Sequence, residues 1–195
     1  DTIYNIHLIE SDDSVLVALT GSYSYYNLIR STNDGMTWHS VNPLYIYFHC
    51  LTQKDHIFYA GSNEGVFLST DEGENWNSTN AGLTDSNIVS LAMSGSTIFA
   101  GTLDSGVFVS VNNGQSWQAV NHGLGNGKIY QLLANDSLIF ALTFGGIYYS
   151  HLDAITWKNF DQGIIGRIWQ IGLTDDYLFA ALENQSLWKR AISDV

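Results

Sequence analysis

The eight residues STDEGENW, Ser69–Trp76, place three acidic side chains, one glycine and one tryptophan in a short stretch. Such a stretch could be a metal-binding loop, part of an active site or a tight turn. Related stretches are STNDGMTW from Ser31, SVNNGQSW from Ser110 and SHLDAITW from Ser150. The four starting serines lie 38, 41 and 40 residues apart. A motif that recurs at a nearly constant period indicates a repeat architecture.

The sequence around each box repeats as well, and one unit contains four short segments of β-forming residues. In the third unit these segments are 87–93, 97–102, 106–110 and 116–120. Each is rich in β-branched or aromatic residues and is bounded by turn residues. Four antiparallel strands in about 40 residues is the size of one β-propeller blade. A β-sandwich is the alternative fold, but a sandwich does not require a repeated box.

The sequence therefore predicts an all-β chain that forms a single domain, a five-bladed β-propeller of four-stranded antiparallel blades. The expected blades are approximately 1–42, 43–83, 84–124, 125–164 and 165–195. The last unit ends in LWKRAISDV and lacks the Gly-x-x-Trp of the box, so we expect its outer strand to be missing or reduced. An uncovered strand edge can pair with another chain, which makes the last blade the expected site of association.

Each box is interpreted as a turn between the third and fourth strands of its blade. Its Asn or Asp would accept hydrogen bonds from turn amides, its Gly would adopt a positive φ, and its Trp would pack on the sheet. A calcium loop needs oxygens at alternate positions and a distant acid, which no box supplies. The structural box residues are Ser31, Asn33, Gly35, Trp38, Ser69, Asp71, Gly73, Trp76, Ser110, Asn112, Gly114, Trp117, Ser150 and Trp157.

Two details of the boxes carry further expectations. Glu72 and Glu74 have no role in the turn, so they are expected to be solvated charges. The fourth box has Leu152 and Ala154 where the acceptor and the Gly should be, so its turn should be built differently.

The pattern Ser-x-Asp/Asn-x-Gly-x-Thr/Ser/Asn-Trp resembles the Asp-box, or BNR repeat, and the resemblance covers nearly the whole chain. This repeat occurs in sialidases, sortilin-like receptors, xyloglucan hydrolases and photosystem assembly factors, so it implies a fold and no single function. The ending LWKRAISDV also resembles the last blade of secreted bacterial Asp-box proteins that carry C-terminal sorting domains. The resemblance implies a secreted or cell-surface location, with the box turns on the face away from the ligand site.

The composition excludes several classes of partner. The chain of 195 residues has 19 acidic and 7 basic residues and a formal net charge of -12. Such a surface repels nucleic acid, because phosphate binding needs clustered Lys and Arg. No apolar run is long enough to cross a bilayer, so we expect no membrane insertion.

The single Cys50 is interpreted as a buried apolar side chain. The start at Asp1 suggests a processed product or an excised domain.

No residue set in the sequence demands a particular chemistry. The chain has no Gly-x-Ser-x-Gly elbow and no phosphate loop. A sialidase needs an arginine cluster, and the arginines here are scattered. His49, Cys50 and His56 lack the spacing of zinc ligands. We therefore expect no catalytic residues, no metal and no cofactor, although two carboxylates could still be brought together by folding.

The first strands of the units suggest a ligand site, because the first strand of a blade lines the propeller axis. Aligning them gives one column of Tyr4, Phe48, Val89, Tyr130 and Trp169 and a second of Asn5, His49, Ser90, Gln131 and Gln170. The candidate ligand-binding residues are Tyr4, Phe48, Tyr130, Trp169, His49, Gln131 and Gln170. Packing between blades is the alternative role of these aromatic residues. The loops between second and third strands, including 22–26, are the other candidate surface.

Six residues are candidate glycosylation sites. Asn77, Asn135 and Asn184 begin Asn-x-Ser/Thr sequons. Thr2, Ser14 and Ser137 lie in Asp-Ser/Thr-apolar triplets, which resemble the O-glycosylation motif of some bacteria that export proteins to their surface. Chance matches are the alternative explanation in a chain this rich in Asn, Asp, Ser and Thr.

These observations favour a secreted or cell-surface module without enzymatic activity. We expect it to act as a structural, self-assembling or protein-interaction unit, with itself or another surface protein as partner and glycans as a further possibility. A lectin-like carbohydrate-binding propeller and a glycoside hydrolase with an unrecognised carboxylate pair are the alternatives.

Overall fold

The computed structural model describes residues 5–22, 25–41, 46–125, 127–153 and 155–194. These residues form five antiparallel sheets, and in each sheet consecutive strands pair with one another. Sheet 1 contains β1 (Ile6–Asp12), β2 (Val15–Ser22), β3 (Tyr25–Ser31) and β4 (His39–Ser40). Sheet 2 contains β5 (Phe48–Lys54), β6 (Ile57–Ser62), β7 (Gly65–Ser69) and β8 (Asn77–Ser78). Sheet 3 contains β9 (Ile88–Ser94), β10 (Thr97–Thr102), β11 (Val107–Ser110) and β12 (Gln118–Ala119).

The remaining two sheets differ in their number of strands. Sheet 4 contains β13 (Ile129–Ala134), β14 (Leu138–Thr143), β15 (Gly146–His151) and β16 (Lys158–Asn159). Sheet 5 contains β17 (Ile168–Leu173), β18 (Tyr177–Leu182) and β19 (Leu187–Ala191), which a short 3-10 helix (Ile192–Asp194) follows. The part of sheet 5 that the structure describes thus has three strands, in agreement with the reduced last unit.

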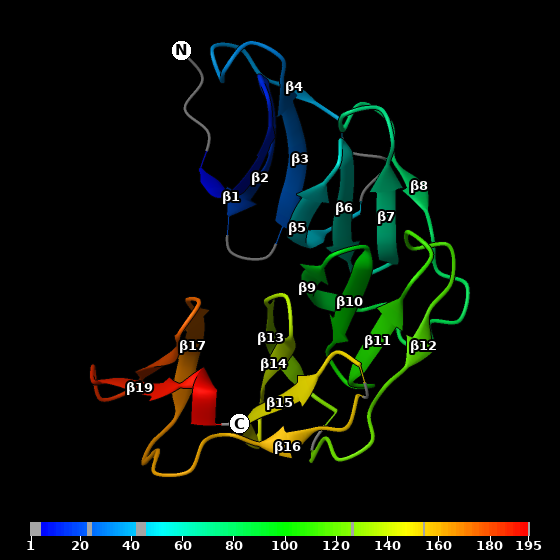
Figure 1. Cartoon of the computed structure of the whole chain (residues 1–195). Helices are drawn as coiled ribbons and strands as arrows, with labels where there is room; N and C mark the ends of the chain where they lie inside the picture. The colour runs from blue at the N-terminus through cyan, green and yellow to red at the C-terminus, as the bar shows by residue number, and fades with distance from the viewer. Residues whose placement is uncertain (1–4, 23–24, 42–45, 126, 154, 195) are drawn as a thin grey trace.

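The five sheets stand side by side in an arc, with the first strand of each on the inner side (Figure 1). The inner strands contact one another in order from β1 through β5, β9 and β13 to β17. Within the described ranges, β1 and β17 do not pack against each other, and the arc is open between sheets 1 and 5.

The core lies between the sheets, in four apolar clusters that each join one sheet to the next. The second strands of sheets 2 to 4 read as continuous apolar runs, which is typical of strands buried on both faces. β6, β10 and β14 are buried in this way. β18 is equally apolar, yet its residues alternate between exposed and buried, because no further sheet in the described part of the chain covers its other face.

Sheet 5 is held to sheet 4 by side chains of β19 as well as by the apolar cluster. The guanidinium of Arg190 stacks over the ring of Phe160 at 4.6 Å and donates a hydrogen bond of 3.1 Å to the carbonyl of that residue. Trp188 contacts the same ring edge-on at 6.0 Å. Arg190 occupies the place where the other sheets have the first serine of the box.

The first three boxes have the same hydrogen bonds, and these are the bonds of a turn. In the second box, the hydroxyl of Ser69 donates to Asp71 Oδ1 and accepts from the amide of Gly73, which has a φ of 84°. Asp71 Oδ1 also accepts from the amide of Asn75 at 2.9 Å. The equivalent groups of the first and third boxes are bonded in the same way. The fourth box differs, since Ser150 Oγ there accepts from the amide of Thr156.

The box tryptophans also join neighbouring sheets. Trp76, Trp117 and Trp157 each belong to the apolar cluster shared with the preceding sheet. Nε1 of Trp117 donates to the Thr79 carbonyl and Nε1 of Trp157 donates to the Val120 carbonyl, both in the preceding sheet. The expectation that each Trp packs on the sheet of its own turn is therefore incomplete, because these three rings also pack against the preceding sheet.

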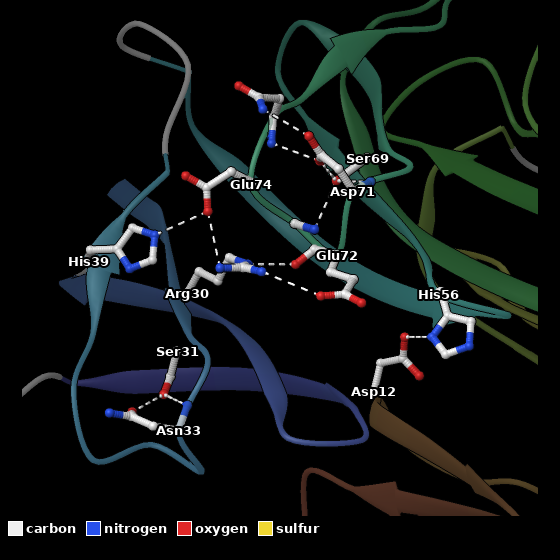
Figure 2. A network of polar contacts seen from close by, with 12 residues as sticks. Asp12, Arg30, Ser31, Asn33, His39, His56, Ser69, Asp71, Glu72 and Glu74 are labelled. Atoms are coloured by element: carbon white, nitrogen blue, oxygen red, sulfur yellow. Dashed lines mark hydrogen bonds and ion pairs between the residues drawn. The ribbon is translucent and has the colours of Figure 1, made fainter.

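Glu72 and Glu74 are exposed, as expected of solvated charges, but both carboxylates also pair with Arg30 of sheet 1 (Figure 2). Arg30 lies 3.6 Å from the Glu72 carboxylate and 3.0 Å from that of Glu74, and its Nε donates to the Glu72 carbonyl at 2.7 Å. Its side chain is only 10% exposed. The box turn of sheet 2 therefore neutralises a buried cation of sheet 1.

Acid titration should reveal the turn-accepting role of Asp71. Hydrogen bonds from the amide and side chain of Asn75 hold the pKa of Asp71 at about 2, below its ordinary value of 3.8. A lowered pKa in the folded state stabilises the fold above about pH 4, and this contribution is lost as the pH falls toward 2. Asp71→Asn should leave stability at neutral pH nearly unchanged, because Oδ1 of Asn33 and of Asn112 accepts the equivalent amide bond in the other boxes. The substitution should also remove this part of the acid loss.

Urea unfolding midpoints measured at intervals from pH 7 to pH 2 test this prediction. Asp153→Asn, which removes an exposed carboxylate from the fourth box, is the matched control. Equal acid sensitivity of wild type and Asp71→Asn would contradict the assignment.

Candidate functional site

Each inner strand contains one β-bulge, and the bulges form a row along the inner side of the arc. The register against the second strand skips one residue in β1, β5, β9, β13 and β17. The skipped residues are His7, His49, Val89, Tyr130 and Trp169, and we call this set the bulge row. A bulge leaves its residue unpaired and redirects its side chain, and bulges are common beside functional sites.

The register corrects the sequence alignment in the first two units. Phe48 is paired with Ser62, so it is equivalent to the core residues Ile88 and Ile129 and not to Tyr130. It is fully buried and packs on Phe67 at 5.6 Å, so its ring is not available to a ligand. Tyr4 lies outside the described residues. His7 and His49 take the two places in the row, and burial lowers the pKa of His49.

The polar residues that follow the bulges connect neighbouring sheets. The side-chain amide of Gln131 forms two hydrogen bonds with the backbone of Ile171 in the next sheet, one donated at 3.0 Å and one accepted at 2.9 Å. Ser90 Oγ, at the same place in sheet 3, accepts from the amide of Leu132 at 2.9 Å. Gln131 is thus an inter-sheet contact, whereas Gln170, its equivalent in sheet 5, is exposed.

Aromatic side chains gather at the end of the bulge row nearest sheets 4 and 5. A cavity of about 430 Å³ lies where β13 and β17 begin, and Tyr130, Phe144, Asp161, Ile164 and Arg167 contribute to its lining. Phe144 is 72% exposed and Tyr130 is 40% exposed.

The rim of this cavity continues onto sheet 5. The guanidinium of Arg167 stacks over the ring of Trp169 at 5.0 Å, and Trp169 is 60% exposed. We call Tyr130, Phe144, Arg167 and Trp169 the aromatic rim. Tyr130 and Trp169 were candidates from the sequence. Phe144 was missed, because it belongs to the loop between β14 and β15 and not to the aligned column.

A second cavity of about 680 Å³ lies at the opposite ends of the same strands. The carboxyl-bearing residues Asp136, Asp175 and Asp176 line it, together with Tyr177 and the 3-10 helix residue Ile192. The turns that join first to second strands in sheets 4 and 5 bring these acids together, which their sequence positions, about 40 residues apart, do not indicate. The aromatic rim is the stronger candidate for recognition, because it combines apolar area with a cation.

No protein-family model matches the sequence, and no curated protein matches it. Solved structures do match. An ancestral GH74 enzyme superposes with a TM-score of 0.76 over 97% of this chain and 30% of its own, at 18% identity. YCF48 from Cyanidioschyzon merolae gives a TM-score of 0.71 over 95% of this chain and 65% of its own, at 14% identity.

A third match is the extracellular domain of a putative one-component system from B. thetaiotaomicron, with a TM-score of 0.70 and 14% identity. It covers 96% of this chain and 28% of its own. All three proteins are β-propellers. The chain has a β-propeller fold. It spans less than two thirds of the length of the propellers that it matches.

A cluster of potential metal ligands joins the first two sheets of the propeller. Asp12 is the last residue of β1, Asp13 follows it, and His56 precedes β6. The ligand atoms of the three residues lie within 4.8 Å of one another. His56 Nδ1 lies 2.5 Å from Asp12 Oδ2 (Figure 2). Two carboxylates and an imidazole could hold a divalent cation. The sequence predicts no such cluster, because Asp12 and Asp13 lie in a different repeat from His56 and meet it only when the first two sheets pack.

The remaining candidates are distributed over the propeller surface. Cys50 is buried, and burial raises the pKa of its thiol to about 12. Ser14, Ser137, Asn77 and Asn184 are exposed. Asn135 is half-buried, and its Oδ1 accepts from the amides of Ser137 and Leu138. Thr2 lies outside the described residues. Among the residues that the structure describes, no helix has the length and apolar character needed to cross a bilayer.

Proposed function

We propose that this chain is a non-catalytic interaction module built on a five-bladed Asp-box β-propeller, secreted or displayed at a cell surface. The observation that carries the proposal is the aromatic rim. Exposed aromatic side chains grouped beside an arginine are typical of protein-binding hot spots, whereas singly scattered ones are not. Ile165, which is 87% exposed, adds an apolar side chain between Ile164 and Gly166, which both line the cavity.

The partner that the rim fits best is an extended polypeptide segment with an apolar side chain and an acidic group. The apolar side chain would enter the cavity between Tyr130 and Phe144, and the acidic group would pair with Arg167, whose guanidinium is already stacked. Two comparisons support this view. One propeller neighbour, YCF48, is described as bound to a D1 peptide, and other neighbours are extracellular domains.

Carbohydrate binding is the second candidate, and the exposed rings of Trp169 and Tyr130 favour it. Aromatic rings stack on the apolar faces of sugars, and GH74 enzymes are among the propeller neighbours. Peptide and carbohydrate binding would use the same rim.

Trp169→Ala should lower the affinity for the partner about tenfold, because an exposed tryptophan at a binding site typically contributes more than 1 kcal/mol. An array of synthetic peptides and a glycan array, both probed with labelled protein, identify the ligand class, and titration of the strongest binders measures the loss. Met36→Ala is the matched control, since Met36 is 82% exposed on a box turn. Binders whose affinity is unchanged by Trp169→Ala would overturn the proposed site.

A further inference from the structure

Neighbouring sheets pack on one another through equivalent surfaces along the whole arc. Each end of the arc exposes one of the two surfaces that such a contact buries. In sheets 2 to 5, the residue equivalent to Ile9 is buried against the preceding sheet, with exposures of 4%, 9%, 2% and 2% for Leu51, Leu91, Leu132 and Ile171. Ile9 itself is 46% exposed. We call Ile6, Ile9, Leu16 and Trp38 the outward face of sheet 1.

Sheet 5 exposes the other half of the contact. The β15 residue Ile147, which faces sheet 5, is fully buried, whereas its equivalent Leu187 is 70% exposed. Phe140 is likewise fully buried, whereas its equivalent Phe179 is half-buried. We call Tyr177, Phe179, Leu187, Lys189 and Gln170 the outward face of sheet 5. Each outward face is thus the kind of surface that every neighbouring pair of sheets buries.

The polar groups of the two faces are complementary as well. Gln131 bonds the backbone of Ile171, and the equivalent pair between the two outward faces is Gln170 and the backbone of Ile9. The strand registers also make Lys189 equivalent to Arg30. Lys189 is paired with Phe179 of β18, and Arg30 is paired with Val17, which has the same position in β2. Box positions make Asp34 equivalent to Glu72, and both adopt a positive φ, of 55° and 58°.

The ion pair between Arg30 and Glu72 therefore has a counterpart in Lys189 and Asp34. At the same strand position, sheets 2, 3 and 4 carry Leu68, Val109 and Tyr149, so only sheets 1 and 5 present a cation to the next box. Lys189 is exposed over the Tyr177 ring at 4.9 Å, and Asp34 is exposed on its turn. A cation on one end of the arc thus matches an anion on the other.

We propose that the outward face of sheet 5 docks on the outward face of sheet 1 of a second copy of this chain, head to tail. The two faces do not meet within the described residues of one copy, because the arc is open between them. Such a contact joins different surfaces of identical subunits, so repetition produces either a closed ring or a filament. This inference goes beyond the proposed function, because it does not use the aromatic rim.

Sedimentation velocity of the wild-type chain from micromolar to millimolar concentration tests association. Leu187→Asp should raise the dissociation constant tenfold or more, about the loss expected for a charge in an apolar contact. Val111→Asp is the matched control, because Val111 is 75% exposed on the third box turn, away from both faces. Thermal melts verify that each variant is folded. A wild-type chain that stays monomeric over the whole range would overturn the proposal.

Cysteine cross-linking tests the geometry. Lys189→Cys mixed with Asp34→Cys should form a disulfide-linked dimer, whereas either variant alone should form much less, and buried Cys50 provides an internal unreactive thiol. Homodimers of Lys189→Cys alone would overturn the head-to-tail arrangement. A purely intrachain disulfide in the double variant Asp34→Cys/Lys189→Cys would also overturn the proposal, because it would show that the two faces meet within one chain. Loss of partner binding in Trp169→Ala with association intact would separate the two functions.

Discussion

Trp157→Ala should lower the free energy of unfolding by about 3–5 kcal/mol, the range for removing a large buried aromatic side chain. Trp157 is 2% exposed and lies in the apolar cluster between sheets 3 and 4. Its indole also donates a hydrogen bond of 2.6 Å to the carbonyl of Val120 in the preceding sheet. Alanine would leave both a cavity and an unpaired carbonyl at the contact between two sheets.

Trp38→Ala is the matched control for this prediction. Trp38 has the same place in the first box, and its Nε1 donates to the carbonyl of Gly35 in its own turn. Among the described residues, no other sheet covers it, and it is only half-buried. We therefore expect a loss of about 1–2 kcal/mol at concentrations where the chain is monomeric. Chemical denaturation of both variants gives the comparison. Equal losses would show that the tryptophans act within their own turns and not between sheets.

Gly123→Ala should destabilise the fold by about 2–4 kcal/mol, from backbone strain and overpacking together. Gly123 has a φ of 86°, where residues with a β-carbon are strained. A β-carbon there would also lie 2.3 Å from the carbonyl oxygen of Trp157 in the next sheet. The amide of Trp157 donates to the carbonyl of the neighbouring His122, so relief of the clash would disturb that bond as well.

Gly163→Ala is the matched control, because Gly163 has nearly the same φ as Gly123 but no atom near the place of a β-carbon. It has a φ of 90°, and a β-carbon there would meet nothing within 4 Å, since sheet 5 carries no box turn in the described residues. Gly163→Ala should therefore show the strain alone, about 1–2 kcal/mol. Unfolding free energies of the two variants measure the difference. Losses of equal size would indicate that the approach of the two sheets contributes nothing.

Most of the strand pattern could be predicted from the sequence, because it depends on local periodicity. The third unit was expected to have strands at 87–93, 97–102, 106–110 and 116–120, and the structure has them at 88–94, 97–102, 107–110 and 118–119. The box turns followed from residue types whose hydrogen-bonding and backbone preferences are local.

The candidate site was only partly predictable. A β-bulge shifts the strand register by one residue, and the alignment of the first two units ignored it, so Phe48 was placed where His49 lies. Phe144 was missed because a loop residue has no repeat signal. The pairing of Glu72 and Glu74 with Arg30 was missed because the partners are about 40 residues apart and meet only when two sheets pack.

The sequence by itself determined the units of this protein: short β-strands, box turns with an acceptor and a glycine, and a tryptophan for each box. These features depend on contacts within one repeat, which residue type and spacing encode. Only the tertiary structure decided which side chains lie between sheets, which reach solvent, and where the arc is open. Equivalent residues such as Phe140 and Phe179 have the same chemistry. They differ in burial because, among the described residues, a neighbouring sheet covers Phe140 and none covers Phe179.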